Sequence, residues 1–209
     1  MSYDLPWANV SNSPFRLFKS WVHEGGISMP FIVNLPPNMK LACNEENNSD
    51  IHHDPWSIMD IVATCCELGG ISVCADLEGE SFLPVFHGKC IKIITIAYIC
   101  SITEDQLLKG HGCKRKQPIF WEHQGNCAAR IGRWKLVYRR CDDEEIGWEL
   151  YDMETDRTEL NNLISLHEEK SLEMINMWKQ WANRCGVKPW PLHAIPEGEK
   201  DWSNLPWLW

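Results

Sequence analysis

The sequence lacks several patterns that assign a chain to a common class of protein. None of its 10 cysteines is spaced C-x-x-C, which argues against a zinc ribbon. The longest apolar run, Ile93 to Ile102, is too short to cross a bilayer, and Lys92 adjoins it. The residues after Met1 include no apolar segment typical of a secretory leader. We therefore expect no membrane span and no signal peptide in this chain.

Positive charge is also scarce. The chain has 20 basic and 29 acidic residues, so its net charge is −9, and nucleic acid is disfavoured as a partner. Its 209 residues are enough for one sizeable core, and the 44% apolar content is ordinary for a globular protein. The 12 tryptophans are many. They favour core packing first and a sugar or aromatic ligand site second.

Composition and turn signals divide the chain into four parts. We expect an α/β core segment over residues 1–89 and an atypical insertion or linker over 90–117. A small α+β subdomain over 118–187 and a Pro/Trp-rich tail over 188–209 follow. Residues 1–17 contain Pro, Asn and Ser and are predicted to be irregular.

Hydrophobic periodicity predicts the elements of these parts. The first part should hold a strand at Pro30 to Val33 and a helix that begins at Asp54-Pro55 and ends at Gly69-Gly70. Three antiparallel strands are predicted in "PIFWEH", "CAARIGRWKLVYRR" and "GWELYDME". A helix from about Leu166 to Arg184 should then pack on this sheet and end at Gly186. Its predicted apolar face comprises Leu172, Ile175, Trp178 and Ala182.

The stretch "FKSWVHEGGISMPFIV" gathers ionisable side chains beside a pair of glycines. Lys19, His23 and Glu24 precede Gly25-Gly26, and the predicted strand follows them. Such an arrangement suits an active-site loop, in which glycines allow a tight backbone turn. The pair His52-His53 is also notable, but without a third ligand it is interpreted as part of a solvated helix cap. No metal ligand is assigned.

Five segments resemble type I sulfatases in the same order along the chain. They are "SNSPFRLFKSWVHEGGISMPFIV", "SIMDIVATCCELGG", "LEGESFLPVFHGK", "FWEHQGNCAARIGRWKLVYRR" and "WELYDMETDRTELNNL". The resemblance covers most of residues 7–190, except 90–116. It implies part of an alkaline-phosphatase-like α/β sulfatase core, followed by a small C-terminal antiparallel sheet packed by a helix.

The resemblance also implies roles for individual residues. Lys19 matches the family lysine that contacts the substrate sulfate, and a compact ammonium suits a developing anion. His23 is a candidate to donate a proton to the leaving oxygen or a hydrogen bond to the sulfate. His123 is a second candidate for substrate binding. The alternatives are a solvated loop lysine and two structural histidines, and Glu24 is expected to be structural.

The sequence departs from the family at its reactive centre. The family nucleophile is a formylglycine made within C-x-P-x-R or S-x-P-x-R, whereas the nearest match here, "NSPFR", has Asn12 in the nucleophile position. The Asp-Asn pair that helps to hold calcium in the family is also absent. The chain is therefore expected to be the C-terminal portion of a sulfatase, inactive and without Ca²⁺ when alone, and to lack an N-terminal half as its partner.

Three functions remain open at this point. The first is a portion of a sulfuric ester hydrolase that acts on a sulfated small molecule or glycan, from an extracytoplasmic parent (secreted, lysosomal or periplasmic). The second is a non-catalytic remnant that binds a sulfated ligand or a partner. The third is an α/β scaffold without a ligand.

Overall fold

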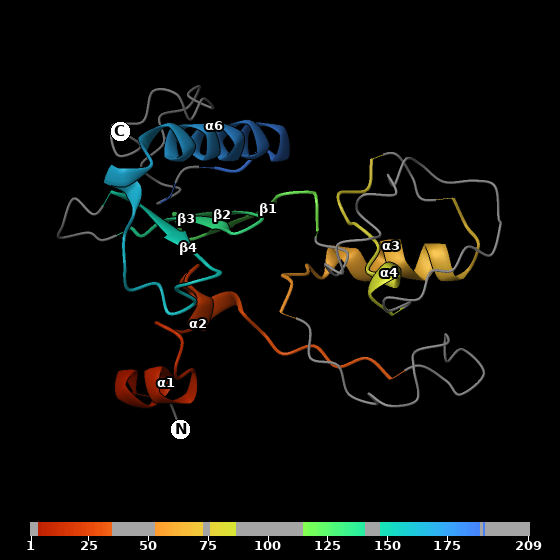
Figure 1. Cartoon of the computed structure of the whole chain (residues 1–209), viewed down its shortest axis with the longest axis horizontal. Helices are drawn as coiled ribbons and strands as arrows, with labels where there is room; N and C mark the ends of the chain where they lie inside the picture. The colour runs from red at the N-terminus through yellow and green to blue at the C-terminus, as the bar shows by residue number, and fades with distance from the viewer. Residues whose placement is uncertain are drawn as a thin grey trace. The chain divides into compact units, whose positions relative to one another are not determined.

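The computed structural model describes residues 4–34, 53–72, 76–86, 115–140, 147–188 and 190 (Figure 1). The chain forms two compact units, which we call the sheet unit and the helical unit. The sheet unit draws on Met1–Pro30 and Pro118–Trp209, and the helical unit on Phe31–Gln117. The N-terminal residues thus belong with the C-terminal sheet, a grouping that the sequence did not suggest. The expected boundaries at residues 89, 117 and 187 stay predictions.

The sheet unit is built on a four-stranded antiparallel sheet. Its strands run in the order β1 (Ile119–His123), β2 (Asn126–Ile131), β3 (Trp134–Tyr138) and β4 (Trp148–Asp152). The prediction of a small antiparallel sheet is confirmed, but one of the three expected strands is a hairpin. It reverses at Gly132, whose φ of 55° is in the left-handed region that glycine adopts readily.

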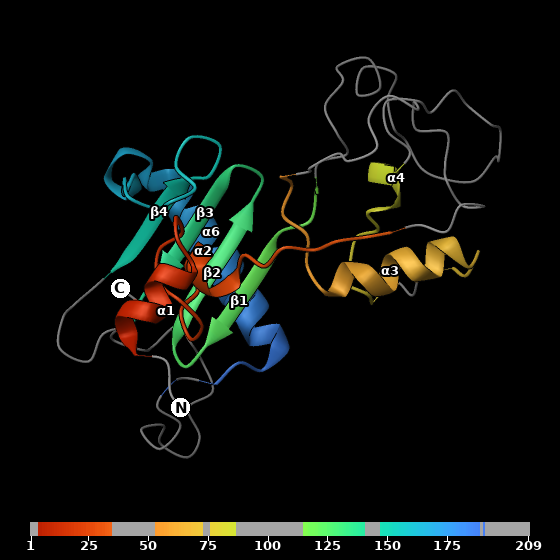
Figure 2. The same ribbon diagram turned by 90° about the horizontal axis from the view of Figure 1, so that it is seen from below.

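The long helix α6 (Glu168–Cys185) covers one face of the sheet and follows the short 3₁₀ helix η2 (Ile164–Leu166), as Figures 1 and 2 show. The predicted helix and its end at Gly186, with φ of 66°, are confirmed. Its predicted apolar face needs one correction. Leu172 is 60% exposed. The buried positions of the helix are spaced by three, four and four residues, at Ser171, Met174, Trp178 and Ala182, and Leu172 is not one of them.

Both faces of the sheet are buried. The face toward α6 forms an apolar core of Cys127, Ala129, Leu136, Tyr138, Trp148, Leu150, Met174, Trp178 and Ala182. The alternate strand positions face the other way, and Ala128, Val137 and Tyr151 there pack with Val22 and Met153. Lys135 also points to this second face, where it is fully buried.

The N-terminal residues cover the second face (Figure 2). They include α1 (Leu5–Ser11) and a single helical turn, α2 (Glu24–Ile27). The prediction that residues 1–17 are irregular is wrong for α1. Its prolines and polar residues fit a helix start: Pro6 lies in the first turn, and the Asn9 amide donates to the Leu5 carbonyl at 2.9 Å.

The helical unit contains α3 (Met59–Leu68) and α4 (Leu83–Phe86). The helix α3 begins at Met59 rather than at Asp54-Pro55, because the Asp60 carboxylate accepts the Ser57 N–H at 2.6 Å. Its predicted end at Gly69-Gly70 is confirmed by the bonds from Gly69 to Cys65 and from Gly70 to Glu67. Arg115 forms a buried ion pair with Asp60 within the same unit.

The predicted strand at Pro30 to Val33 is wrong. These residues have no regular structure, and no strand of the described ranges pairs with them. A strand without a neighbour leaves its backbone groups unpaired, so the apolar pattern alone does not produce one. Phe31 and Ile32 are exposed. Among the helices that the structure describes, none is long and apolar enough to span a bilayer.

Candidate functional site

An open hollow of about 520 Å³ lies in the sheet unit. It is formed where the loop of residues 17–22, called here the Lys19 loop, meets the tip of the β1–β2 hairpin. Its lining comes from two short stretches: Lys19, Ser20, Trp21, Val22, Gly26 and Ile27 on one side, and Trp121, Glu122, His123 and Gln124 on the other. Two segments about a hundred residues apart in sequence thus form one concave surface. Concave surfaces with aromatic walls and a few polar groups are the usual form of a ligand site.

The structure brings two of the three sequence-predicted site residues together. Lys19 and His123 are both exposed and both line the hollow. His123 is the last residue of β1 and pairs with Asn126 across the hairpin. The substrate-binding roles of Lys19 and His123 stay predictions, with a shared location to support them.

Three of the lining residues that were not predicted from the sequence bear on its chemistry. Trp21 and Trp121 provide aromatic walls, and Glu122 adds a carboxylate whose Oε1 accepts the Gly125 N–H at 2.9 Å. Each is one or two residues away from Lys19 or His123. Proximity to the two predicted residues was the only signal in the sequence that pointed to them.

His23 lies outside the hollow, in the interior of the sheet unit. Its side chain is fully buried, and its Nε2 is 3.3 Å from a carboxylate oxygen of Glu149. Its Nδ1 has no hydrogen-bond partner among the described residues. The catalytic role of His23 stays a prediction, but the burial of the ring favours a role in holding the loop.

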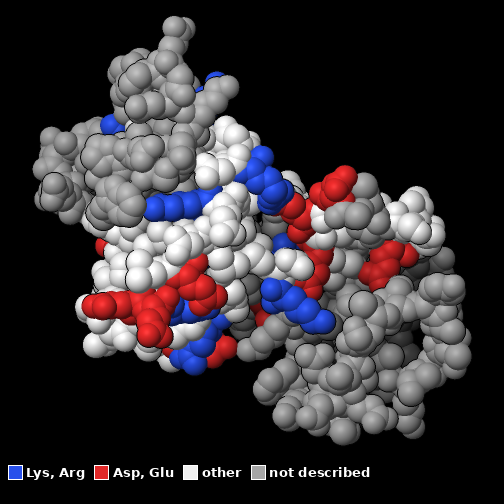
Figure 3. Space-filling model, turned by 90° about the horizontal axis from the view of Figure 1, so that it is seen from above, with Lys and Arg blue, Asp and Glu red and all other residues white. Residues whose placement is uncertain are grey.

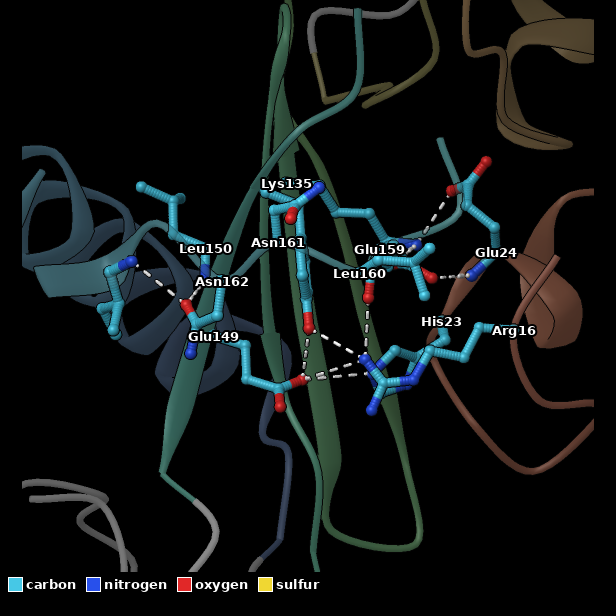
Figure 4. Close-up of polar contacts among 12 residues, drawn as sticks. Arg16, His23, Glu24, Lys135, Glu149, Leu150, Glu159, Leu160, Asn161 and Asn162 are labelled. Carbon is cyan, nitrogen blue, oxygen red and sulfur yellow. Dashed lines mark hydrogen bonds and ion pairs between the residues drawn. The ribbon is translucent and has the colours of Figure 1, made fainter. Parts of the chain in front are cut away.

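A polar network anchors the loop to β4 (Figure 4). Arg16 donates to the Tyr151 hydroxyl and to the Glu159 carbonyl, both at 2.9 Å. The Tyr151 hydroxyl in turn donates to Glu149 at 2.9 Å. Burial raises the pKa of Glu149, but the hydrogen bonds from His23 and Tyr151 outweigh it and leave this pKa below its ordinary value. Burial and then Glu149 raise the pKa of Tyr151, so its hydroxyl stays a donor.

A second, charged cluster lies beside this network. The Lys135 ammonium is 2.8 Å from a carboxylate oxygen of Glu24 and 2.8 Å from one of Glu159 (Figure 4). The Glu24 N–H also donates to Glu159 at 2.8 Å. Burial raises the pKa of Glu24, but Lys135 offsets it and the pKa is lower than usual. The expectation that Glu24 is structural agrees with these contacts.

The two glycines after Glu24 are needed for space. A Cβ atom on Gly25 would overlap the carbonyl oxygens of Leu17 and Arg16, and one on Gly26 would overlap that of Trp21. Neither glycine has a positive φ, and both lie within α2. We expected Gly25 and Gly26 to allow a tight turn, but in the structure they allow other backbone segments to pack closely against them.

No metal site can be assigned to the described part of the chain, which contains no cluster of three or more His, Cys, Asp or Glu that could hold an ion. The carboxylates beneath the Lys19 loop are already paired, Glu24 and Glu159 with Lys135. The described residues do not fit the calcium of the sulfatases. Arg16 of "NSPFR" serves the anchoring network described above, and His52 lies outside the described ranges.

Figure 3 shows the α6 side of the sheet unit, part of whose surface is described. Basic and acidic side chains are interspersed on the described surface of that side. Lys170, for example, pairs with Glu173 at 2.8 Å on the helix itself. The hollow with Lys19 and His123 therefore remains the best candidate.

Comparison with known proteins finds sulfatases. The chain is 29% identical over 207 residues to an uncharacterized sulfatase of Schizosaccharomyces pombe, a match that covers 93% of this chain and 32% of the relative. It is 22% identical over 215 residues to a sulfatase of Formosa agariphila, covering 92% of this chain and 34% of that protein. The solved structure of Ps i-CgsB is 19% identical, with a TM-score of 0.43, over 62% of this chain and 24% of that one.

The two sequence matches, to the S. pombe and F. agariphila proteins, confirm the resemblance to sulfatases. No protein-family model matches the chain. The chain spans about a third of the length of the first two relatives, 32% and 34%.

Proposed function

Because the chain is related to the sulfatases over nearly its whole length, we propose that it is the C-terminal portion of a sulfuric ester hydrolase for aryl or carbohydrate sulfates. The observation that carries the proposal is the meeting of Lys19 and His123 at one open hollow. The parent protein would act outside the cytoplasm. The hollow would bind the sulfated end of the substrate.

The side chains of the hollow suit a sulfate ester. The Lys19 ammonium is a compact charge for the sulfate oxygens, and His123 adds a hydrogen-bond donor. Trp21 and Trp121 offer apolar faces for an aryl or sugar ring. Glu122 would accept hydroxyl hydrogens of a sugar, so an aryl sulfate, which has no such donors, should bind more weakly than a sulfated sugar.

The reaction itself would need groups from outside this chain. Sulfatases use a formylglycine nucleophile, and calcium, when bound, supplies positive charge to that nucleophile and the sulfate. The sequence has no C-x-P-x-R motif, and its described residues do not fit calcium. We propose that the chain binds a sulfate ester but does not hydrolyse it, and that an N-terminal sulfatase segment supplies both groups.

The first test measures binding and turnover with the purified 209-residue chain. We expect 4-nitrophenyl sulfate to shift the Trp21 indole signal in NMR spectra, without release of nitrophenol when calcium is added. Lys19→Ala should weaken binding about tenfold, as the loss of one charged contact does. Lys188→Ala, another exposed lysine, is the matched control. Turnover that disappears in Lys19→Ala would reveal an overlooked nucleophile.

The second candidate function is a non-catalytic remnant that binds a sulfated ligand. It is favoured by the presence of the hollow in a sequence without the nucleophile motif. Co-expression with the N-terminal segment of a related sulfatase distinguishes the hydrolase portion from the non-catalytic remnant. Restored hydrolysis that falls about a hundredfold in Lys19→Ala supports the hydrolase portion. Binding without restored hydrolysis supports the remnant.

A further inference from the structure

Asn126 connects the two sides of the hollow from beneath. It is the first residue of β2, and its side chain is almost completely buried. Its Nδ2 donates to the Ser20 carbonyl at 3.2 Å and to the His123 carbonyl at 3.1 Å. Its Oδ1 accepts the Arg140 N–H at 3.1 Å. The amide group of Asn126 thus binds the backbone of Ser20, which follows Lys19, and the backbone of His123.

The orientation of this amide follows from its partners. Two carbonyl oxygens lie on the Nδ2 side and one N–H lies on the Oδ1 side. The flipped amide would bring its oxygen against two carbonyl oxygens and its NH₂ against an N–H. Asn126 is therefore a donor to both walls in the only orientation that satisfies its neighbours.

The backbone around Lys19 needs such support. Leu17 and Ser20 have φ values of 66° and 83°, in the left-handed region that residues other than glycine rarely adopt. Conformations of this kind persist when surrounding contacts hold them. Trp21 donates to the Phe18 carbonyl at 3.2 Å within the loop. The bond from Asn126 to Ser20 ties the loop to the sheet.

We propose that Asn126 is a positioning residue that fixes the separation of Lys19 and His123 across the hollow. It is absent from the lining of the hollow, so it would act through the two backbones and without touching the ligand. This inference rests on the proposed binding of a sulfate ester at the hollow. Without Asn126, the Lys19 loop would sample conformations in which the lysine and the histidine no longer face one ligand.

Asn126→Asp tests this role with little change in shape. The aspartate keeps an acceptor for the Arg140 N–H but loses the donor, and its charge faces the Ser20 and His123 carbonyls. Asn162→Asp is the matched control, because both hydrogen bonds of Asn162 are accepted by its Oδ1, from Leu150 at 3.1 Å and Ile164 at 3.0 Å. Asn126→Ala is the second variant, which removes the donor without adding charge.

The first measurement is amide hydrogen exchange of the full chain without ligand. In Asn126→Asp we expect exchange to accelerate about tenfold or more within residues 17–22, while β3 and α6 keep wild-type protection. Asn162→Asp should leave the loop unchanged. Unchanged loop exchange in both Asn126 variants would overturn the proposal. Equal acceleration throughout the sheet would also overturn it, because Asn126 would then be a general stability residue.

The second measurement is the affinity for 4-nitrophenyl sulfate. We expect Asn126→Asp and Asn126→Ala to bind about tenfold more weakly than wild type at temperatures well below unfolding, and Asn162→Asp to bind normally. Wild-type affinity in both Asn126 variants would overturn the role in positioning. A wild-type chain that binds no sulfate ester refutes the proposed function and this inference with it, whereas a wild-type chain that binds, with unchanged affinity in both Asn126 variants, refutes the inference alone.

Discussion

The two faces of the four-stranded sheet are buried by different means, and the face covered by the N-terminal residues, here called the loop face, adds buried charges to its apolar contacts. On the α6 face, aromatic and aliphatic side chains such as Trp178 and Leu150 pack without ion pairs in the described core. On the loop face, Lys135 and Glu24 form a buried ion pair. Apolar contacts tolerate small changes in shape, whereas a buried charge needs its particular partner. The loop face therefore holds its covering segment in one position, and this segment carries Lys19.

The two faces also differ in how far apart their partners lie in sequence. On the loop face the contacts of Glu24 with Lys135, of His23 with Glu149 and of Glu24 with Glu159 span 111, 126 and 135 residues. The helix α6 follows its sheet directly along the chain. The loop face depends on groups from both ends of the chain, so it should be the first part lost when one partner is removed.

The largest expected effect is that of Lys135→Met, which leaves Glu24 and Glu159 buried without a shared cation. We expect a loss of about 4 kcal/mol in the free energy of unfolding, measured by urea denaturation at pH 7. Lys170→Met is the control, because Lys170 pairs with Glu173 on the helix surface, and it should cost less than about 0.5 kcal/mol. Equal costs would refute the contrast between the faces.

The next effect is expected for Gly26→Ala, which would press a methyl group against the Trp21 carbonyl. The loop must shift to make room, and overpacking of this kind costs about 3 kcal/mol. Gly147→Ala is the control, since nothing lies within 4 Å of a Cβ there and its φ is not positive. Thermal unfolding measures both variants. A neutral Gly26→Ala would show that Gly26 does not approach the Trp21 carbonyl so closely.

The difference between the faces also explains what the sequence could predict. The spacing of Trp178 and Ala182 predicted the helix that covers the sheet, because an α-helix repeats its buried face locally. Leu172 was misplaced because two adjacent apolar stripes satisfy the same spacing, and only the docked structure selects one. The strand at Pro30 to Val33 failed for a related reason, since an apolar run becomes a strand only beside a partner.

The hollow was predictable only in part. The resemblance to sulfatases pointed to Lys19 and His123, and the structure places both at the hollow. Trp121 was indicated only by its proximity to His123, and nothing in the local sequence of Asn126 indicated that it would approach the Lys19 loop. His23 looked equivalent to Lys19 in the sequence, but its side chain points into the interior. Only the packing of the loop on the sheet distinguishes the two.

A smaller and pH-dependent effect is expected for Glu24→Gln. Burial raises the pKa of Glu24, but Lys135 outweighs burial and leaves this pKa below its usual value of 4.5, so the stabilisation by Glu24 is complete above that pH. We expect the variant to be about 2 kcal/mol less stable at pH 7. The difference should shrink as the pH falls through the folded-state pKa, because wild-type Glu24 then becomes neutral. Urea denaturation at pH 7, 5, 4 and 3 measures it, and a difference that stays constant down to pH 3 would contradict the ion pair.

The smallest effect is expected on the α6 face, for Met174→Leu. Met174 is fully buried among apolar side chains, and leucine has nearly the same volume without a polar atom to satisfy. Swaps of this kind cost less than about 1.5 kcal/mol. Lys135→Arg is the corresponding swap on the loop face, and it should cost more, because the larger guanidinium must fit a fully enclosed site between two carboxylates. If Met174→Leu proves the more damaging of the two, shape and not charge would be the stricter constraint in this sheet.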